Sequence, residues 1–472
     1  MTCAVVFAMM FCSTIRLKEV TPTLRVIEGP INGVRIRREG KELVVYGDPR
    51  ENPPPAEFVL FTHHRRDVLW AGKELAEGAA QSFAPAKELS LFVEPRSFWK
   101  RFDRIRLRDT ECQSTKICFD PIKIGRGVRE GEEIRWRGIK FVVIETPGFT
   151  RGSVSYFAEI DGLRIAFTGD LIYAGGKIFD LYSLQDAIPA LRIGGYHGFA
   201  ARASQLIRSL EKLQRLKPEV LIPARGPIIY DPQHTIHLLI ENLKSLFRNY
   251  LSTDALRWYF GKEHVLAKAK RVLGANPSLE LLPRAEVVRE KPPDWIISFF
   301  TSRILVQQGW GFLIDCGSAA VFSEIEKLRK KGTLKAIEGI YVTHYHGDHT
   351  ERVGEAASRY GCAVYACEEF KDILQNPEAY HMPAMTPNPI RNVVGMKNGS
   401  KLFWRGLTLT FYYFPGQTLY HGGLLVEGKN RDPIFFVGDS FTPDGIDDYC
   451  LLNRNFLRSG WGYLRCLDLI KR

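Results

Sequence analysis

The chain has 472 residues, which is too long for one ordinary domain and suggests about two to four. Hydrophobic residues make up 45% and charged residues 25%, and the 12% of aromatic residues argues against a disordered chain. The net charge of +12 is spread along the sequence and accompanies no nucleic-acid-binding motif, so we interpret it as a solvated surface.

The first fifteen residues are apolar and contain no lysine or arginine. They have the apolar middle of a secretory signal but lack its positively charged start, and they are too short to span a membrane. We favour a buried first strand over a signal remnant, and the cytoplasm as the location. The nine scattered cysteines, with no Cys-x-x-Cys pair, fit reduced thiols there. No transmembrane anchor is expected, and the oligomeric state stays open.

The N-terminal half begins with strand patterns. Residues 25–46 show two stretches of alternating apolar and polar residues around a glycine-containing turn, which predicts a pair of strands. Residues 58–62 predict a short buried strand. Residues 146–170 contain a Thr-Pro-Gly turn, then alternating strand residues that end in Gly-Asp.

Helical patterns follow. Residues 200–216 have the apolar spacing of an amphipathic helix, residues 219–223 indicate a short buried strand, and residues 232–275 look largely helical. The proline-rich stretch 277–293 is the best candidate boundary. We therefore predict three parts: a domain at 1–250, a helical connector and linker at 251–293, and a second domain at 294–472.

The C-terminal half opens in the same way as the first. Residues 294–317 again predict two alternating strands, and residues 337–343 predict a buried strand. That strand runs into Thr-His-Tyr-His-Gly-Asp-His at residues 343–349. Further on, a Phe-Pro-Gly-Gln-Thr turn leads through similar strands to a second Gly-Asp, which ends at Asp439.

The two halves match at two landmarks. When Thr62 is aligned with Thr343, each half continues with a histidine and then an aspartate. The Pro-Gly turn and the closing Gly-Asp recur in the same order and at nearly the same spacing, at Asp170 and Asp439. We therefore interpret the chain as one layered α/β unit present twice, with sheets inside and helices outside.

The loop at 343–349 gathers four side chains that can bind a metal ion: His344, His346, Asp348 and His349. Two histidines two residues apart point to the same side of an extended chain and can hold one cation, while the Asp-His pair can face a neighbouring position. Imidazole and carboxylate ligands suit zinc first, then iron or manganese. Four such residues after a buried strand are far more specific than a lone histidine, so we predict a metal site.

On these motifs the chain resembles the metallo-β-lactamase-fold superfamily. The resemblance covers the C-terminal half and, in degenerate form, the N-terminal half. It implies an αββα sandwich present twice, with one or two metal ions at the sheet edge. The residues that match the family's ligands are His344 and His346 for a first metal, Asp348 and His349 for a second, and Asp439 as the bridge. Asp315 matches a supporting aspartate.

The C-terminal half departs from the family at two places. Gln417 stands where the family usually has the histidine of a Pro-Gly-His-Thr turn. We suppose that His421 takes this third ligand role through a shifted loop, with Gln417 itself or a water as alternatives. The family also has a last histidine after a further helix and strand, whereas none follows His421, and residues 457–472 fit that helix. Either this copy is truncated or its second metal site is incomplete.

The N-terminal half has lost most of the ligands. The family's ligand positions hold Arg65, Val68, Phe149 and Arg225. Only His63 and Asp170 stay clearly ligand-like, and Asp67 partly. Because two or three ligands hold a catalytic zinc poorly, we expect this half to be free of metal. It is then a packing partner, a lid or a binding surface, and Arg65 and Arg225 suggest an anion pocket.

The expected activity is hydrolysis. A metal ion with an open position lowers the pKa of bound water toward about 7, and Asp348 would orient that water or take its proton. With one or two Zn²⁺ ions, the substrate is expected to be a small molecule with an ester, thioester, lactone or related bond, not a nucleic acid. The alternatives are a mononuclear iron thiol or persulfide dioxygenase and a non-catalytic binding protein. The fold does not choose the substrate.

Overall fold

The computed structural model describes two compact units. The described residues are 16–100, 117–178, 203–252, 261–283, 290–380, 382, 385–441 and 462–472. Unit 1 holds the described residues up to 245, and unit 2 holds those from 246 onward. The predicted first strand at 1–15 lies outside the described residues, as do the first residues of the helices predicted to begin at 200 and 457. The three-part division at 250 and 293 stays a prediction.

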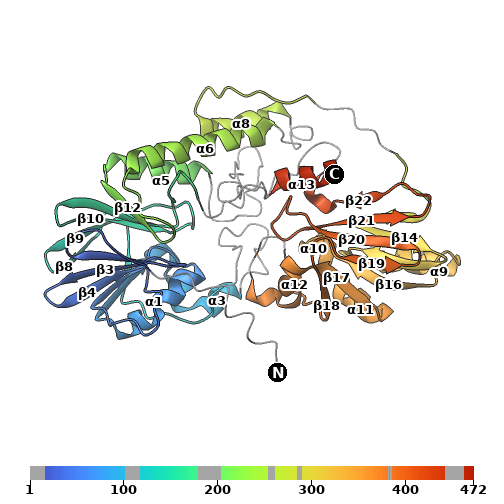
Figure 1. Cartoon of the computed structure of the whole chain (residues 1–472), viewed down its shortest axis with the longest axis horizontal. Helices are drawn as coiled ribbons and strands as arrows, with labels where there is room; N and C mark the ends of the chain where they lie inside the picture. The colour runs from blue at the N-terminus through green and yellow to red at the C-terminus, as the bar shows by residue number, and fades with distance from the viewer. Residues whose placement is uncertain are drawn as a thin grey trace. The chain divides into compact units, whose positions relative to one another are not determined.

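Unit 1 contains two β-sheets (Figure 1). The seven strands of the first sheet lie in chain order: β1 (Arg16–Glu19), β2 (Leu24–Glu28), β3 (Gly33–Arg38), β4 (Lys41–Val45), β5 (Phe58–Leu60), β6 (Gln81–Pro85) and β7 (Arg126–Val128). The second sheet has the order β12 (Val220–Pro223), β11 (Leu163–Gly169), β10 (Val154–Ile160), β9 (Ile139–Glu145) and β8 (Glu133–Trp136). Its last strand β12 runs parallel to β11, and the other neighbours are antiparallel.

The helices of unit 1 cover the sheets. They are α1 (Arg66–Gly78), α2 (Leu89–Val93), α3 (Pro95–Trp99), α5 (Ala203–Arg215) and the first part of α6 (Pro232–Ser252), with a 3-10 turn at Ala86–Glu88. Helix α1 buries Val68, Leu69 and Leu75 on one face, and Gly72 lets the helix approach β5, because a Cβ there would lie 2.4 Å from the ring of Phe61. One core joins α1 with the facing sides of both sheets.

Unit 2 repeats this plan with a shorter second sheet. Its first sheet has the order β13 (Ile296–Phe299), β14 (Ser302–Gln307), β15 (Trp310–Ile314), β16 (Ala336–Tyr341), β17 (Ala363–Cys367) and β18 (Val393–Met396). Its second sheet has the order β19 (Lys401–Trp404), β20 (Leu407–Tyr413), β21 (Gly422–Gly428) and β22 (Ile434–Phe436). Side chains such as Phe312 and Phe411 fill the core between the two sheets.

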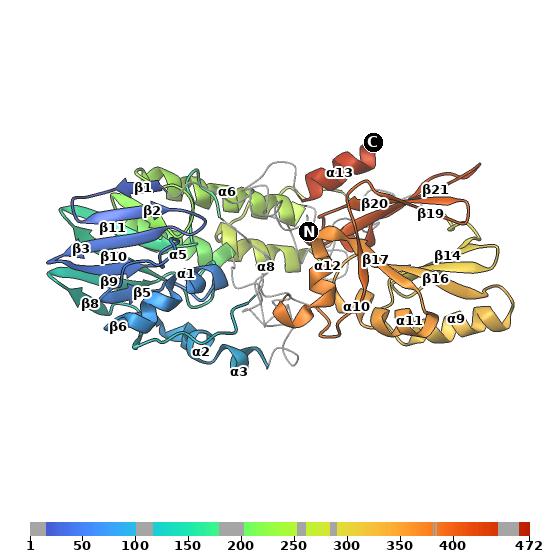
Figure 2. The same cartoon turned by 60° about the horizontal axis from the view of Figure 1, so that its bottom comes forward.

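The helices of unit 2 lie mainly on the first sheet. They are α8 (Lys262–Leu273), α9 (Ala320–Lys330), α10 (Gly347–Thr350), α11 (Val353–Tyr360), α12 (Glu368–Gln375) and α13 (Tyr463–Lys471), with 3-10 turns at Pro377–Ala379 and Gly438–Ser440. Figure 2 shows α9 and α11 on one side of β14 and β16, and β19 to β21 on the other. A separate core, which includes Val321, Val353 and Phe370, lies between these helices and the first sheet.

The opening of each unit has one strand more than the sequence suggested. Residues 25–46 form β2, β3 and β4, and residues 294–317 form β13, β14 and β15. Short turns at Glu39–Gly40 and Gln308–Gly309, in which both residues have positive φ, reverse the chain inside these stretches. Each of these turns carries a glycine in the sequence, Gly40 and Gly309, but the prediction counted only one turn in each stretch.

Equivalent backbone bonds confirm that the αββα sandwich is present twice. The amide of Asp315 donates to the carbonyl of Tyr341 (2.8 Å), and in unit 1 the amide of Tyr46 donates to the carbonyl of Leu60 (3.0 Å). Asp315 and Tyr46 share a positive φ of 60° and 71°. Tyr46 is therefore the counterpart of Asp315, a substitution that the sequence comparison did not reveal.

Candidate metal centre

The three histidines of the motif lie at the end of β16, where the chain turns into the short helix α10. Backbone bridges join His344 to His421 and His346 to Met385, so the loop is fixed on both sides. The ring centroid of His344 lies 4.6 Å from that of His346 and 4.2 Å from that of His349. All three side chains are buried. The structure thus brings the predicted imidazoles into one cluster.

Asp315 orients two of these histidines. Its carboxylate accepts hydrogen bonds from the amide of Thr343 (2.8 Å) and the hydroxyl of Thr343 (2.7 Å), and it lies 2.8 Å from Nδ1 of His349. Since the Thr343 hydroxyl gives its proton to Asp315, it accepts one from Nδ1 of His344, 3.0 Å away. This arrangement turns the Nε2 atom of His344 toward the centre of the cluster, as metal sites require.

His421 reaches the cluster from the neighbouring strand. Its Nδ1 donates to the carbonyl of Gly422 (3.1 Å), and its ring stacks on that of His344 with centroids 4.7 Å apart. A Cβ on Gly438 would lie 2.6 Å from this ring, so a residue without a side chain is needed there. The buried Nε2 atoms of His344 and His421 have no hydrogen-bond partner among the described residues. Such buried acceptors fit a metal ion.

The loop that carries His421 has the same length as the matching loop of unit 1. The amide of Phe414 donates to the carbonyl of His421 (3.0 Å), and in unit 1 the amide of Thr146 donates to the carbonyl of Ser153 (2.9 Å). The two turns therefore have the same length, and His421 occupies the place of Ser153 at the start of a strand. This match is between the two units, so the expected shift relative to the family stays a prediction. The strand itself presents His421, while Gln417 is buried in the turn.

Asp439 completes the closest group of donors. Its Oδ2 lies 3.3 Å from Nε2 of His349 and 3.9 Å from Nε2 of His344, and the three ligand atoms lie within 4.8 Å of one another. Asp348 lies at the edge, with Oδ2 3.6 Å from Nε2 of His349 and a side chain that is 62% exposed. Two nitrogens and a carboxylate oxygen at this spacing suit zinc or iron.

Burial and the neighbouring carboxylates act differently on the histidines of the cluster. Burial lowers the pKa of His344 well below its usual value and that of His421 to about 3, so both rings are neutral, the form that binds metals. Burial raises the pKa of Asp439, but the hydrogen bond and charge of His349 outweigh it and bring the pKa to about 2. Burial lowers the pKa of His349, whereas Asp315 and Asp439 raise it well above its usual value.

The corresponding place in unit 1 is closed by an arginine. The guanidinium of Arg225 lies 3.2 Å from both carboxylate oxygens of Asp170 and forms an ion pair with Asp67. Asp170 also accepts from the hydroxyl of Tyr173 (2.7 Å) and lies 3.2 Å from Nε2 of His63. Because two carboxylates already neutralise Arg225, the suggested anion pocket with this residue is wrong. Arg65 instead stacks over the ring of Phe149, 4.6 Å from its centroid.

The sequence analysis did not identify Glu88, a second residue that distinguishes unit 1 from unit 2. The buried carboxylate of Glu88 accepts from the amide of His64 (2.9 Å), from the hydroxyl of Thr150 and from the amide of Gly152 (2.8 Å), and it lies 2.7 Å from Nδ1 of His64. It thereby ties the motif loop to the Pro-Gly turn. In unit 2 the strand pairing places Phe370 at this position, and the residue matching His64 is a tyrosine. Sequence spacing gives no signal for such a distant pair.

Among the described residues, the candidate metal centre is less covered than the matching place in unit 1. In unit 1 the strand β12 covers β11, and the Arg225 that follows it covers Asp170, whose side chain is 0% exposed. In unit 2 the strand that matches β11 is β22. It is only half-buried, and among the described residues it pairs with β21 alone. Asp439 is accordingly 35% exposed.

Comparison with known proteins gives one match in each half of the chain. The sequence pattern of the metallo-beta-lactamase superfamily matches residues 56–225 and 302–453, which together make up more than half of the chain. The chain belongs to the metallo-beta-lactamase superfamily. Both halves are members of it, as the resemblance of the motifs implied.

Individual relatives in the superfamily are distant. The hydroxyacylglutathione hydrolase of Marinomonas sp. (strain MWYL1) is 26% identical over 111 residues, which are 24% of this chain and 35% of that protein. The chain thus spans about a third of that relative's length. Among solved structures, a metallo-beta-lactamase family protein from Thermus thermophilus has 17% identity and a TM-score of 0.37, covering 54% of this chain and 92% of that chain. A metallo-beta-lactamase with a HARLDQ motif from Cronobacter sakazakii has 14% identity and a TM-score of 0.34, covering 45% and 78%.

The described helices include none with the length and apolar character needed to cross a bilayer.

Proposed function

We propose that unit 2 is a metal-dependent hydrolase. The observation that carries the proposal is the group formed by His344, His349 and Asp439, whose ligand atoms lie within 4.8 Å of one another. The Nδ1 atoms of both histidines are held by neighbouring side chains, so their Nε2 atoms are positioned before any ion binds. The superfamily generally binds zinc, which matches this set of donors.

Each residue of the centre has a proposed role. His344, His346 and His421 hold a first metal ion, and His349 and Asp348 hold a second where two are bound, with Asp439 between them. A bound zinc ion supplies a water molecule of lowered pKa and polarises the bond to be broken. Asp348 orients that water and takes its proton. Its exposed side chain at the edge of the cluster supports this role, since it can meet both water and substrate.

The substrate is proposed to be a small molecule with a thioester, ester or lactone bond. The name of the Marinomonas relative, hydroxyacylglutathione hydrolase, makes acyl-glutathione thioesters the first class to test. The partial exposure of Asp439, whose side chain is 35% exposed, supports access of such a molecule to the cluster. Unit 1 takes no direct part in the chemistry, because Arg225 already neutralises the carboxylate that matches Asp439.

Hydrolysis by the zinc-loaded protein tests the proposal. We expect turnover of at least one thioester, ester or lactone, lost in His349→Ala and reduced by about 10² to 10⁴ in kcat in Asp348→Asn, which keeps the first metal ion. Oxygen consumption with a thiol or persulfide by the iron-loaded protein, without hydrolysis, would establish the dioxygenase instead. A folded, metal-loaded protein with neither activity would make unit 2 a binding protein.

A further inference from the structure

The main chain of Asp348 is held by two residues from outside the motif loop. The hydroxyl of Thr301, in the turn between β13 and β14, donates to the carbonyl of Asp348 (2.7 Å). Gly317, in the loop after β15, packs against the same carbonyl, because a Cβ at Gly317 would lie 1.6 Å from its oxygen. That distance leaves no room for a side chain, so this close approach requires glycine.

The backbone around Gly317 fixes the same segment. The amide of Cys316 donates to the carbonyl of His349 (2.8 Å), and the amide of Arg352 donates to the carbonyl of Cys316 (2.8 Å). The loop after β15 is thus bonded to α10 and to the chain that follows it. Helix α10 has only four residues. Because so short a helix is not stable by itself in water, these tertiary contacts determine where it lies.

The contacts with the main chain matter because the side chain of Asp348 is not held by packing. The rings of His344 and His349 are buried, and each is oriented through its Nδ1 atom. The side chain of Asp348 is 62% exposed. An aspartate has only two side-chain torsions, so a shift of its main chain moves the carboxylate by a similar distance. The place of this carboxylate therefore depends on Thr301 and Gly317.

Unit 1 uses the same position of the turn for a different segment. When the hairpin turns of the two units are matched, Asn32 stands where unit 2 has Thr301. The side-chain amide of Asn32 donates to two carbonyls on either side of Arg225 (3.0 and 2.7 Å). In each unit, this turn residue thus holds a segment of the centre, which carries Arg225 in unit 1 and Asp348 in unit 2.

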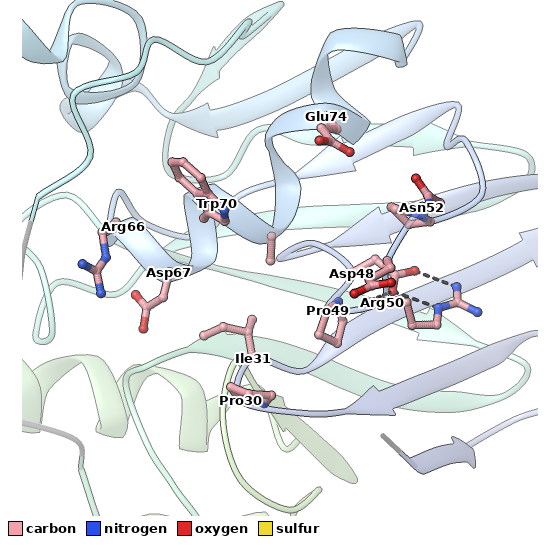
Figure 3. A pocket seen from close by; sticks show the side chains of 13 residues that line it. Pro30, Ile31, Asp48, Pro49, Arg50, Asn52, Arg66, Asp67, Trp70 and Glu74 are labelled. Carbon is pink, nitrogen blue, oxygen red and sulfur yellow. Dashed lines mark hydrogen bonds and ion pairs between the residues drawn. The ribbon is translucent and has the colours of Figure 1, made fainter. Parts of the chain in front are cut away.

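The direct contact with the motif aspartate differs between the units. Figure 3 shows the matching region of unit 1, where a groove lies among the turn at Ile31, the loop at Asp48 and Asp67 of α1. Asp48 stands where unit 2 has Gly317, and its amide donates to the carbonyl of Ala71 (2.9 Å), one helical turn beyond Asp67. The close approach to the aspartate itself belongs to the unit with the proposed metal ligands.

We propose that Thr301 and Gly317 are positioning residues for Asp348. The proposal rests on the proposed function of unit 2, in which Asp348 holds a second metal ion and orients a water molecule. The two residues fix the carbonyl of Asp348, so that its exposed carboxylate stays at the edge of the cluster. A misplacement of about 1 Å at a catalytic group lowers the rate by about a hundredfold. The ligands of the first metal ion do not depend on this contact.

Zinc titration of the full chain against a chromophoric chelator tests the proposal. Thr301→Val keeps the shape of the side chain but removes its hydroxyl, and we expect it to weaken binding of the second zinc ion by about fivefold, with unchanged binding of the first. Thr301→Ser keeps the hydroxyl and should restore wild-type binding. Gly317→Ala should weaken the second ion by about tenfold or more, because its Cβ displaces the carbonyl of Asp348.

Amide hydrogen exchange of the metal-free chain distinguishes this proposal from the proposed function. The amides of His349 and Thr350 both donate to the carbonyl of His346 (3.0 Å). We expect Thr301→Val to speed their exchange by about fivefold, since opening of α10 becomes easier. Unchanged exchange would overturn the positioning role, whatever the protein hydrolyses. Faster exchange in a chain whose wild type binds no second zinc ion would instead show that the proposed function of Asp348 is wrong.

Two matched variants control for indirect effects. Thr23→Val removes an exposed threonine hydroxyl of unit 1 that donates to Asp161 (2.6 Å), and Gly78→Ala adds a methyl group where unit 1 has open space. Neither should change zinc binding or the exchange of α10. Equal losses in Thr301→Val and Thr23→Val, or equal weakening of both zinc ions in Thr301→Val, would overturn the proposal. Circular dichroism of Gly317→Ala separates a displaced Asp348 from a lost fold.

Discussion

The carboxylate of Asp315 lies 2.8 Å from Nδ1 of His349, although the two residues are far apart in the sequence. The same oxygen accepts the hydroxyl proton of Thr343, which in turn holds His344. One buried carboxylate at the end of β15 thus sets the orientation of two proposed ligands on the next loop. This relationship makes Asp315 a positioning residue for the candidate metal centre.

Asp315→Asn should therefore weaken metal binding without removing any ligand. An amide of the same shape has one accepting oxygen, so it cannot accept from His349, from the Thr343 hydroxyl and from the Thr343 amide at once. We therefore expect zinc affinity to fall by about tenfold to a hundredfold. Competition with a chromophoric chelator measures the affinity. Asp294→Asn, at a side chain that is 96% exposed, is the matched control and should have no effect. Equal zinc affinities of the two variants would show that Asp315 does not position the metal ligands.

Two variants decide whether His421 or Gln417 is the third metal ligand. We expect His421→Ala to lower zinc affinity by about tenfold or more, because its buried Nε2 atom faces the cluster. Gln417→Ala should change the affinity by less than about threefold if Gln417 neither binds the metal nor orients a ligand, since loss of a partner that orients a ligand would cost about tenfold or more. The same chelator competition serves for both. The reverse order of the two effects would assign the ligand role to Gln417.

Much of the fold could be predicted because the same short sequence patterns occur in both halves of the chain. The motif after a buried strand and the two Gly-Asp ends are short patterns, and the structure places their residues in equivalent positions. The place of His421 could not be predicted, because it depends on which amide pairs with which carbonyl across the turn. A one-residue change in that pairing would point the side chain to the other face of the strand.

The replacements in unit 1 show a second kind of feature that the sequence does not predict, namely contacts between residues far apart in the chain. The sequence shows Arg225 at a ligand position, but it does not show that the carboxylates of Asp67 and Asp170 both contact this arginine. Its charge therefore suggested an anion pocket, whereas the two carboxylates already neutralise it. The contacts of Glu88 join β6 to two other loops, and no periodic pattern reports such a contact.

Arg225→Met should destabilise unit 1 strongly. The variant leaves Asp170 buried without its main cation, and removal of one partner from a buried ion pair costs about 3 to 5 kcal/mol. We expect this loss in the free energy of unfolding by urea, with unchanged zinc content. Arg37→Met, at an exposed arginine of the same unit, controls for the substitution. A loss below about 1 kcal/mol would contradict a stabilising role for Arg225.

Glu88 should make the stability of unit 1 depend on acid. Burial raises the pKa of its carboxyl, but the charge of His64 and hydrogen bonds from His64 and Thr150 outweigh it and lower the pKa from 4.5 to about 2. The ionised carboxylate therefore stabilises the fold fully above about pH 4.5, and this contribution is lost as the pH falls toward 2.

Glu88→Gln tests this dependence. We expect a loss of about 3 kcal/mol in unfolding free energy at pH 6 that shrinks steadily between pH 4.5 and pH 2. Denaturant melts at several pH values measure it, with the exposed Glu77→Gln as control. A loss that is the same at every pH would mean that the charge of Glu88 is not the cause.

Metal analysis of the purified protein tests the central claim most directly. Elemental analysis by mass spectrometry gives both the identity and the number of metal ions per chain. We predict one or two zinc ions, lost in His344→Ala and retained in His63→Ala, since the cluster in unit 2 holds the metal and the matching place in unit 1 is closed by Arg225. No bound metal after reconstitution with zinc, or metal that persists in His344→Ala, would contradict the account.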